Sequence, residues 1–432
     1  MRILCISAQK PDSTGSGVYL AETVRSMINA GHEVAVIAGI DRDDQPELPD
    51  GCEFFPVRYR IDELPFSVCG MSDVMPYDAT RYRDMTPDMV STFRQAFGER
   101  IEEVVRAFKP EAILCHHLYL VCSVMVETME RLAREAGENR SPDKEEEARL
   151  LPEQPKCTLW ALSHSTDLRQ LRSHDLERER IIAAVNRLDG IMSLHDEQAA
   201  EIVDLFGVAP QKVRIVGTGY NSREFNASRS LRSATPLRIL YVGKICKAKG
   251  VESLVRCLSN LPKSLGNVKL TLVGGHSDQA QYDRITRLAA QSPVPVRFAG
   301  RVSQEDLVKA YQSSHVFVLP SFYEGLPLVT IEAMACGCRA VVTDLPGVRP
   351  WLDAALPGAP VHYVETPTIV GTDIPVESEL PAFEARLADA LASALVEAAA
   401  NPSASTGFDT TAVSWDSLAG RIVALLASSA AN

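Results

Sequence analysis

Two glutamates that stand eight positions apart are the residues of this sequence best placed to do chemistry. Glu324 follows an apolar run at 315–319 that predicts a buried parallel strand, and Glu332 lies in a helix predicted at 329–336 and ended by Gly337. Ligands of open α/β sheets bind at the carboxyl ends of strands, where the amides of a helix start favour an anion such as a diphosphate. Two carboxylates there need hydrogen-bond donors as partners, and the hydroxyls of a sugar and a ribose would supply them. We expect both carboxylates on the surface of this ligand-binding crevice.

A basic turn at 243–250 is the second place where chemistry is predicted. It follows a strand predicted at 237–242, and a helix is predicted to start near Val251. Lys244 and Lys249 would hold a diphosphate without a metal ion, helped by the dipole of that helix. An ordinary solvated basic turn is the alternative. Because no Asp-x-Asp stands at a strand end in this half of the chain, we expect no metal site and no cofactor.

The segment 323–337 resembles the Glu-x-x-x-x-x-x-x-Glu signature of the family 4 retaining glycosyltransferases, which use nucleotide sugars. The resemblance implies the GT-B fold, with two Rossmann-like, doubly wound parallel-sheet domains that face a central cleft. It also implies that Glu324 binds the donor sugar, that Glu332 binds the ribose and that Lys249 stabilises the diphosphate. The further donor-binding residues that it implies here are Gly243, Lys244, Val302, Gly325, Leu328 and Val329. Lys244 stands where the family usually has arginine, and a lysine offers a phosphate a point charge without the bidentate fork of arginine.

The first half of the chain offers a histidine and a glycine-rich turn. His164 follows a strand predicted at 158–162 and resembles the family's histidine that approaches the donor sugar, although a structural histidine is the alternative. Gly15, Ser16 and Gly17 form a turn that would let a ligand approach the backbone. Leu20 stands where the dinucleotide motif has its third glycine, which argues against a dehydrogenase.

Three further residues are expected on the acceptor side. His117 adjoins His116 at a strand end, and we expect these neighbours to point in opposite directions, which disfavours a shared metal. Tyr77 and Arg81 lie in a long connection at 66–86 that mixes aromatic rings with arginines. A loop that merely covers the sheet edge is the alternative for that connection.

Composition narrows the class of protein. The 432 residues suggest two to three domains, and 46% hydrophobic with 23% charged residues is typical of a globular chain. The formal net charge of −12 disfavours nucleic acid as a partner. Ten cysteines without a paired framework indicate reduced thiols. With no signal peptide and no apolar span in the sequence, we expect a cytoplasmic protein.

Strand-like and helix-like runs alternate along the chain, and the pattern restarts midway. We predict an N-terminal, acceptor-side domain at 1–220, a linker at 221–236 and a nucleotide-sugar-binding domain at 237–404. The resemblance implies that the C-terminal helix, within 405–432, packs back on the first domain. Strands are predicted at 2–7, 33–38, 112–115, 158–162, 190–194 and 213–216, and then at 237–242, 269–273, 296–299, 316–319 and 340–343.

These observations favour a metal-independent, retaining hexosyltransferase. Its donor would be a nucleoside diphosphate sugar, a UDP-sugar rather than a GDP-sugar, and its acceptor a small molecule, a glycan or a lipid-linked group. A nucleotide-sugar epimerase or a phosphorylase with the same fold is the alternative among enzymes. A nucleotide-sugar-binding protein without catalysis is the alternative from another class.

Overall fold

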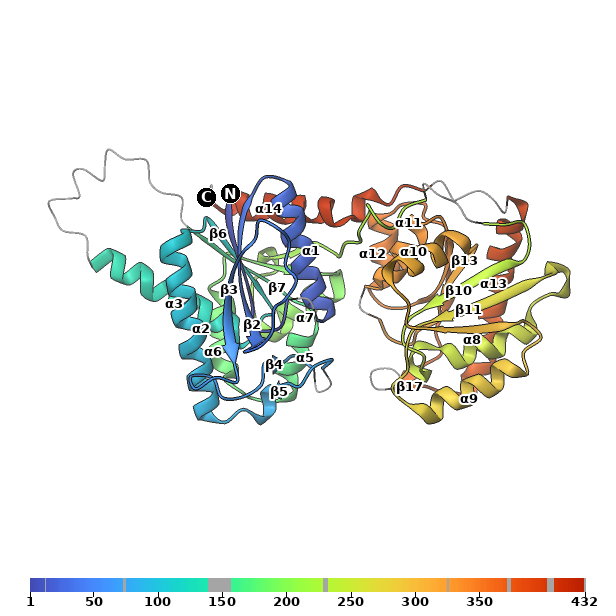
Figure 1. The fold of residues 1–432 in the computed structure, drawn as a ribbon, viewed down its shortest axis with the longest axis horizontal. Helices are drawn as coiled ribbons and strands as arrows, with labels where there is room; N and C mark the ends of the chain where they lie inside the picture. Colours follow the sequence, from blue (N-terminus) through green and yellow to red (C-terminus); the bar gives the residue numbers. More distant parts are fainter. Residues whose placement is uncertain are drawn as a thin grey trace. The chain divides into compact units, whose positions relative to one another are not determined.

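The chain forms two compact α/β units in a computed structural model that describes residues 1–11, 13–72, 75–138, 157–227, 232–324, 326–370, 374–401 and 408–430. The first unit comprises Met1–Gly217 and Trp415–Asn432, and the second comprises Thr218–Ser414 (Figure 1). No helix among the described residues is long and apolar enough to span a membrane. All ten cysteines are free thiols.

The sheet of the first unit has seven parallel strands in the order β3-β2-β1-β6-β7-β8-β9. Their bounds are β1 Arg2–Ser7, β2 Glu33–Asp41, β3 Glu53–Tyr59, β6 Ala112–His116, β7 Thr158–Leu162, β8 Gly190–Ser193 and β9 Val213–Ile215. The chain reverses its direction of travel across the sheet between β1 and β6. In an open α/β sheet, that switch point is where the loops part and a ligand site forms.

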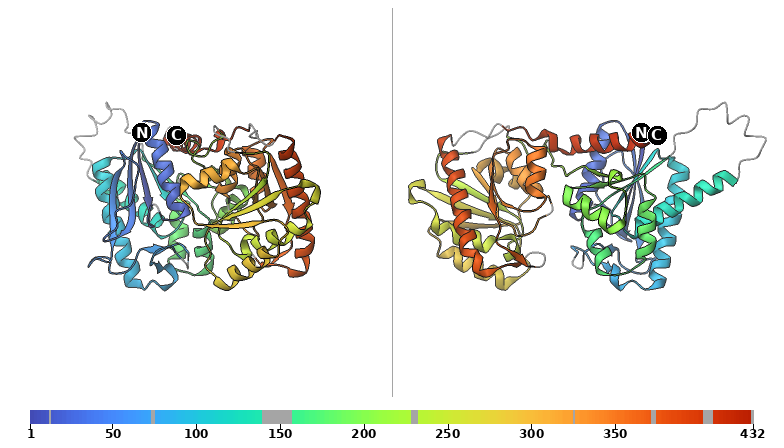
Figure 2. Two further views of the ribbon diagram at one scale, coloured as in Figure 1. Left: turned by 45° about the vertical axis from the view of Figure 1, so that its right-hand side comes forward. Right: turned by 180° about the vertical axis from the view of Figure 1, so that it is seen from behind.

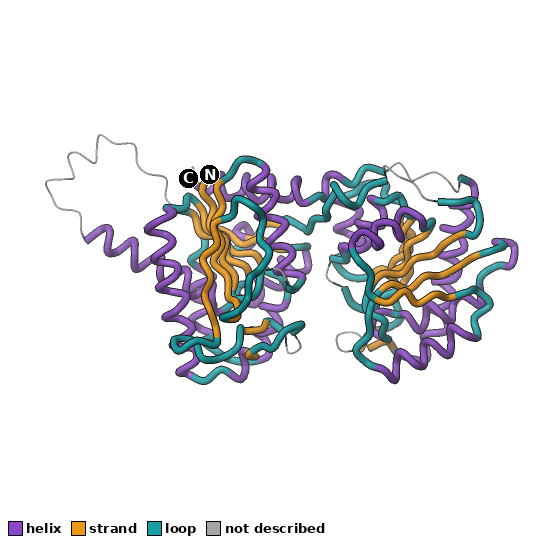
Figure 3. Tube along the Cα trace, in the orientation of Figure 1, coloured by secondary structure: helices purple, strands orange, loops and turns teal. Residues whose placement is uncertain are grey.

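Among the described residues, the helices around this sheet (Figure 3) have the bounds α1 Gly15–Asn29, α2 Pro87–Phe108, α3 Leu120–Glu138, α5 Thr166–Ser173, α6 Arg178–Asn186, α7 Asp196–Phe206 and α14 Trp415–Ala430. Helix α2 packs on α3, and α3 packs on α6. The apolar side chains of α2 recur every three to four residues and are buried, namely Val90, Phe93, Phe97, Ile101, Val104 and Phe108. That spacing puts them on one helix face, so the sequence itself directs this face to the core.

The C-terminal helix α14 belongs to the first unit. It packs along α1, as the views from both sides show (Figure 2). The ring of Trp415 meets the ring of Tyr19 edge to face at a centroid distance of 5.0 Å, and both side chains are buried. Aromatic pairs of this geometry contribute about 0.5–1.5 kcal/mol beyond the burial of their surface. The start of α14 is therefore anchored on the helix that follows the glycine-rich turn.

The sheet of the second unit has six parallel strands in the order β12-β11-β10-β13-β14-β15. Their bounds are β10 Leu237–Val242, β11 Val268–Val273, β12 Val296–Gly300, β13 Val316–Leu319, β14 Arg339–Asp344 and β15 Val361–Glu365. Its longer helices are α8 Val251–Cys257, α9 Gln279–Ala290, α10 Gln304–Ser313, α11 Leu328–Ala335, α12 Val348–Ala355 and α13 Leu380–Ala400. Helices α8, α9 and α13 pack together, and α10 packs on α11. The switch point of this sheet lies between β10 and β13.

Minor elements complete the described chain. The two short strand pairs are β4 Cys69–Gly70 with β5 Thr80–Arg81, and β16 Ile369–Val370 with β17 Ile374–Pro375. The 3-10 turns are η1 Tyr82–Asp84, η3 Pro210–Lys212, η4 Lys247–Lys249, η5 Leu258–Asn260, η6 Lys263–Leu265, η7 Glu377–Glu379 and η8 Thr411–Val413.

Each sheet has one strand more than the sequence pattern predicted. Strand β3 was missed because Pro56 interrupts its apolar run, and a proline is tolerated there since β3 is the edge strand. Strand β15 is the edge strand of the second sheet, and most of its residues are only partly buried. Edge strands lack the continuous apolar run of a strand covered on both faces, so they give a weak sequence signal. Helix α1 begins at Gly15, so the glycine-rich turn expected from the sequence is already part of the helix.

Candidate active site

The loops after β10 and β13 dock on each other at the switch point of the second sheet. Gly250 ends η4 with a φ of 65°, and a Cβ there would lie 1.9 Å from the carbonyl oxygen of Pro320, which follows β13. The amide of Phe322 donates to the carbonyl oxygen of Ala248 at 3.0 Å. Only glycine allows this close approach. The backbone therefore fixes the basic turn against the loop that carries Glu324.

This docking brings Lys249 and Glu324 into direct contact. Lys249 Nζ lies 2.7 Å from Glu324 Oε1, and the hydroxyl of Ser321 donates to the same oxygen at 2.7 Å. The lysine side chain is 29% exposed and the glutamate side chain 15%, so the pair is partly shielded from water. Within the described part of the chain, Glu324 Oε2 accepts no hydrogen bond. The carboxylate thus has one oxygen held by the protein and one oxygen open to a ligand.

Glu332 is set more deeply than the sequence suggested. The flanking residues of α11, including Ile331 and Ala333, are buried, and Glu332 itself is partly buried. The hydroxyl of Tyr311, on α10, donates to Glu332 Oε2 at 3.1 Å. Burial raises the pKa of Glu332 to about 7, although this hydrogen bond acts to lower it. Glu332 is partly shielded from water, because α11 is an apolar helix packed on the sheet and α10.

The remaining residues expected to bind the diphosphate lie around the same switch point. Lys244 is exposed, and its carbonyl oxygen accepts a hydrogen bond from the hydroxyl of Tyr241 at 2.7 Å. Leu328 and Val329 begin α11, where amides have no acceptor within the helix. Gly243 follows β10 directly. Gly325 lies outside the described residues.

Val302 lies at a different strand. It follows β12 and Arg301, and it is 36% exposed. Strand β11 separates β12 from β10. Because neighbouring strands lie about 4.8 Å apart, the ends of β12 and β10 are roughly 10 Å from each other. Val302 is thus on the same sheet edge as Lys249 without adjoining it.

In the first unit, three histidine rings cluster at the ends of β6 and β7. His116 Nδ1 lies 3.0 Å from His164 Nε2, and the rings of His117 and His164 are 4.8 Å apart between centroids. His116 and His117 therefore do not point in opposite directions as expected. His117 has a φ of 76°, so the chain is not extended there and both rings reach His164.

Burial keeps these histidines neutral. Burial lowers the pKa of His116 to about 3, and it also lowers the pKa of His117 below its ordinary value. The pKa of His164 is lowered well below its ordinary value by burial and, in addition, by the two neighbouring imidazoles. His117 is fully buried, while His164 remains partly exposed. Of the three rings, His164 is the one that has access to solvent and can form a hydrogen bond with a ligand as a neutral imidazole.

Asp167 holds this cluster together, although no role for it was predicted from the sequence. Its Oδ2 accepts the amide of Leu118 at 2.8 Å, and its Oδ1 accepts the Ser163 hydroxyl at 3.0 Å and the His164 amide at 3.3 Å. The carboxylate is fully buried. It therefore joins the chain after β6 to the chain after β7. An aspartate at the start of a helix was the available signal, but such residues usually cap their own helix.

The glycine-rich turn begins α1. Thr14 caps the helix by accepting the amide of Gly17 at 3.1 Å, and Ser16 donates to Gln9 Oε1 at 3.1 Å. Gly15, Ser16 and Gly17 are thus the first turn of α1, at the carboxyl end of β1. Their position agrees with a ligand-facing turn, although the residues are already ordered by side-chain hydrogen bonds.

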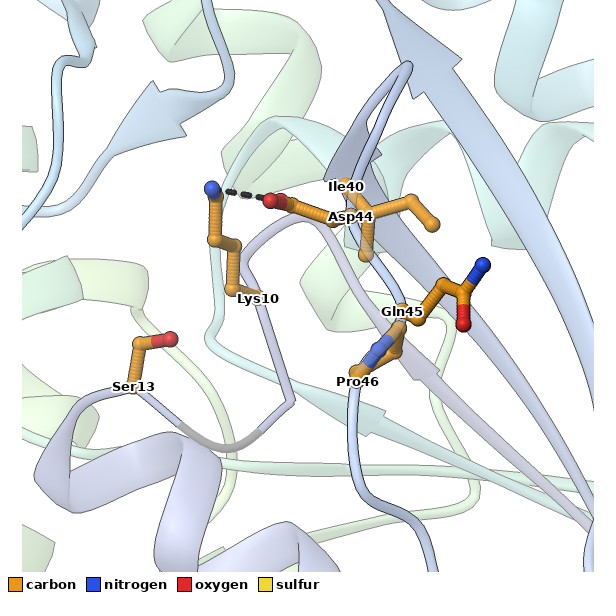
Figure 4. A pocket seen from close by; sticks show the side chains of 6 residues that line it. All are labelled: Lys10, Ser13, Ile40, Asp44, Gln45 and Pro46. Atoms are coloured by element: carbon orange, nitrogen blue, oxygen red, sulfur yellow. Dashed lines mark ion pairs between the residues drawn. The ribbon is translucent and has the colours of Figure 1, made fainter.

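The residues Tyr77 and Arg81 separate in the structure. Tyr77 lies under Lys10, whose Nζ is 4.9 Å from the ring centroid. Lys10 in turn lines a cavity of about 120 Å³ beside β1 and β2 (Figure 4). Arg81 instead forms an ion pair with Asp84, with its Nε 2.5 Å from Oδ2. Tyr77 therefore supports the wall of a cavity, whereas Arg81 belongs to a local surface pair.

Comparisons with known proteins relate part of this chain to glycosyltransferases. Residues 222–359 match the family model described as "Glycosyl transferases group 1". The chain is 29% identical over 187 residues to the D-inositol 3-phosphate glycosyltransferase of Streptomyces bingchenggensis. This alignment covers 39% of this chain and 40% of that protein. The chain is 23% identical over 363 residues to the protein of the same name from Kineococcus radiotolerans, covering 78% and 74% of the two chains. The first relative is thus matched over less than half of its length.

Solved structures match over nearly the whole chain. The α,α-trehalose-phosphate synthase (UDP-forming) from Burkholderia vietnamiensis superimposes with a TM-score of 0.61 at 16% identity, covering 100% of this chain and 97% of that chain. The sucrose-phosphate synthase from Thermosynechococcus elongatus has a TM-score of 0.59 at 18% identity, with coverages of 99% and 98%. At this identity the likeness concerns the fold. The chain therefore carries a group 1 glycosyl transferase domain within residues 222–359, and its two parallel-sheet units have the GT-B fold.

Proposed function

We propose that the protein is a retaining, metal-independent glycosyltransferase that moves a hexosyl unit from a UDP-sugar to an acceptor. The observation that carries this proposal is the arrangement at the second switch point. There, a lysine, the first turn of a helix and two partly buried carboxylates gather at the carboxyl edge of a parallel sheet. A cation and helix amides suit a diphosphate, and carboxylates suit hydroxyl groups.

The names of relatives support a sugar donor. Besides the inositol phosphate glycosyltransferases, the chain is 30% identical over 188 residues to a serotype-specific mannosyltransferase, WbdA, of Escherichia coli, which covers 40% of this chain and 23% of that one. The name of the trehalose-phosphate synthase describes it as UDP-forming. We favour a UDP-sugar for this chain on that likeness of fold, together with the site at β10 and β13.

In the proposed reaction, the bond between the anomeric carbon and the diphosphate breaks first. Lys249, with the Leu328 and Val329 amides, stabilises the negative charge that develops on the leaving diphosphate. Glu324 Oε2 accepts a hydroxyl of the transferred sugar, and Glu332 accepts a ribose hydroxyl. The acceptor oxygen then forms the new bond on the same face of the sugar and transfers its proton to the departing phosphate. His164, as a neutral imidazole, is proposed to contact a sugar hydroxyl.

Thermal unfolding with a panel of nucleotides tests the proposal. A ligand at a hundred times its Kd stabilises the native state by about 2.7 kcal/mol, so binding should raise the Tm measurably. We expect UDP and UDP-sugars to raise the Tm more than GDP or ADP, with and without EDTA. Transfer from the best donor should also survive EDTA. Absence of any nucleotide effect would contradict the proposed function, and activity restored only by magnesium or manganese would contradict metal independence.

A further inference from the structure

The cavity beside β1 and β2 has a wall of mixed chemistry. It is lined by Lys10, Ser13, Ile40, Asp44, Gln45 and Pro46 (Figure 4). Its volume of about 120 Å³ is well below the roughly 300–1,000 Å³ of pockets that enclose a whole small molecule. The cavity therefore suits one ring or one arm of a larger ligand. It also adjoins the carboxyl ends of two parallel strands, where open α/β sheets bind ligands.

Lys10, a cation that lines the cavity, is already neutralised by two aspartates. Lys10 Nζ lies 2.5 Å from Asp44 Oδ2 and 3.3 Å from Asp41 Oδ2, and its side chain is 12% exposed. Arg60 Nε lies 3.2 Å from the other oxygen of Asp41. A phosphate would have to displace Asp44 from Lys10 and would then meet two carboxylates. The cavity is therefore poorly suited to an anion.

Asp44 is held in a fixed orientation with one oxygen unused. Its Oδ2 accepts the amide of Asp41 at 3.0 Å in addition to the contact with Lys10. Burial alone would raise the pKa of Asp44, but Lys10 and the amide outweigh that effect and hold the pKa below its ordinary value. Among the residues that the structure describes, Asp44 Oδ1 accepts no hydrogen bond. Because the side chain is 33% exposed, this oxygen is accessible to a hydroxyl donor.

The remaining lining residues suit a polyol ring. Gln45 is exposed and offers both an amide donor and a carbonyl acceptor, and Ser13 adds a hydroxyl. Ile40 and Pro46 supply apolar surface for the C–H face of a ring. An ionised carboxylate, an amide and an apolar wall together recognise a ring with several hydroxyl groups and no charge.

We propose that this cavity is a subsite for the acceptor, and that the part of the acceptor it binds is a neutral, hydroxyl-rich ring. The inference rests on the proposed function, because only a transferase requires an acceptor. It goes beyond that function by naming the chemical class recognised and the residue, Asp44, that recognises it. Lys10 acts here as a positioning residue, since it orients the carboxylate and does not itself bind the ring.

Saturation-transfer NMR on the full chain, with myo-inositol, glucose and mannose as probes, tests the subsite. The matched pair of variants is Asp44→Asn and Asp43→Asn, because the neighbouring Asp43 side chain is 85% exposed and pairs only with Arg42 among the described residues. We expect at least one polyol to bind wild type and Asp43→Asn, and its Kd to rise about tenfold or more in Asp44→Asn. Gln45→Ala, at an exposed residue, serves as a second variant if Asp44→Asn fails to fold.

Three outcomes would overturn the subsite. They are no polyol binding by wild type, equal binding by the two aspartate variants, and competition in which inorganic phosphate displaces the polyol. UDP binding, measured on the same samples, separates this failure from a failure of the proposed function. If wild type binds UDP while the polyol results fail, only the acceptor subsite is wrong. If UDP does not bind either, the proposed function fails as well.

Discussion

Lys249 Nζ and Glu324 Oε1 lie 2.7 Å apart, so the cation proposed for the diphosphate and the carboxylate proposed for the sugar neutralise each other. An ion pair this shielded is not a strong source of stability, because desolvation offsets much of the Coulomb attraction. The ion pair instead holds the side chains of Lys249 and Glu324 next to each other. A diphosphate that approaches Lys249 replaces part of the interaction with Glu324 and leaves that carboxylate available to the sugar.

Replacing Lys249 should weaken nucleotide binding without unfolding the protein. Lys249→Ala removes a charged hydrogen-bond donor worth about 1.5–3 kcal/mol, so we expect the Kd for UDP to rise at least tenfold. Lys247→Ala is the control, since Lys247 is in the same turn and pairs with Glu377. Calorimetry on both variants measures the difference. Equal affinity for UDP in Lys249→Ala and wild type would remove Lys249 from the site.

Glu324 and Ser321 should affect turnover rather than nucleotide affinity. In Glu324→Gln the sugar loses its anionic acceptor while Lys249 is released, so we expect UDP to bind at least as tightly and kcat to fall by roughly a hundredfold. Ser321→Ala should show the same pattern more weakly, because Ser321 fixes Glu324 Oε1. Ser314→Ala is the control, as another buried serine with a short hydrogen bond, to the carbonyl oxygen of Ala310. A matching loss of kcat in Ser314→Ala would indicate a general packing effect.

Glu332 should make both stability and nucleotide binding depend on pH. Its pKa is raised from 4.5 to about 7 in the folded protein. Between these values the folded state holds a proton that the unfolded chain has released, so the free energy of unfolding falls as the pH rises through this window. Glu332→Gln should abolish that fall and be more stable at pH 8 by up to about 3 kcal/mol.

The same substitution should weaken UDP binding at pH 8, because the ionised carboxylate is the better acceptor for ribose hydroxyls. Wild-type affinity for UDP should decline toward pH 6 and approach that of Glu332→Gln. Denaturant unfolding and calorimetry across this range measure both effects. Glu305→Gln, at a side chain that is 80% exposed on α10, is the control. A wild-type profile as flat as that of Glu332→Gln would contradict the raised pKa.

Gly250 should tolerate alanine less well than another glycine of similar backbone. Gly250 and Gly207 both have left-handed backbones, with φ and ψ of 65° and 14° at Gly250 and 64° and 25° at Gly207. An added Cβ meets Pro320 at Gly250 but has open space at Gly207. Gly207→Ala should cost about 1–2 kcal/mol for its positive φ. Gly250→Ala should cost roughly 1–3 kcal/mol more and also raise the Kd for UDP, because the turn must move away from Glu324. Equal unfolding midpoints for the two variants would show that the loops are not tightly docked.

The two sheets and the identity of the residues at their carboxyl edges could be predicted from the amino-acid sequence. Buried parallel strands need near-continuous apolar runs, and runs such as those at Arg2–Ser7 and Leu237–Val242 are visible without a structure. The spacing of Glu324 and Glu332 was equally visible. The edge strands β3 and β15 were not visible in the sequence, because a strand covered on one side only does not need a continuous apolar run.

Which of these residues contact each other could not be predicted from the sequence, because it depends on the three-dimensional fold. The contact of Lys249 with Glu324 joins positions 75 residues apart and depends on Gly250 packing against Pro320. The raised pKa of Glu332 depends on its burial in the core around α11, and the buried histidine cluster depends on the positive φ of His117 and on Asp167. Local sequence fixes the direction of a strand or helix over a few residues. Burial, charge pairing and pKa depend on atoms that are distant in the chain, and folding alone brings those atoms together.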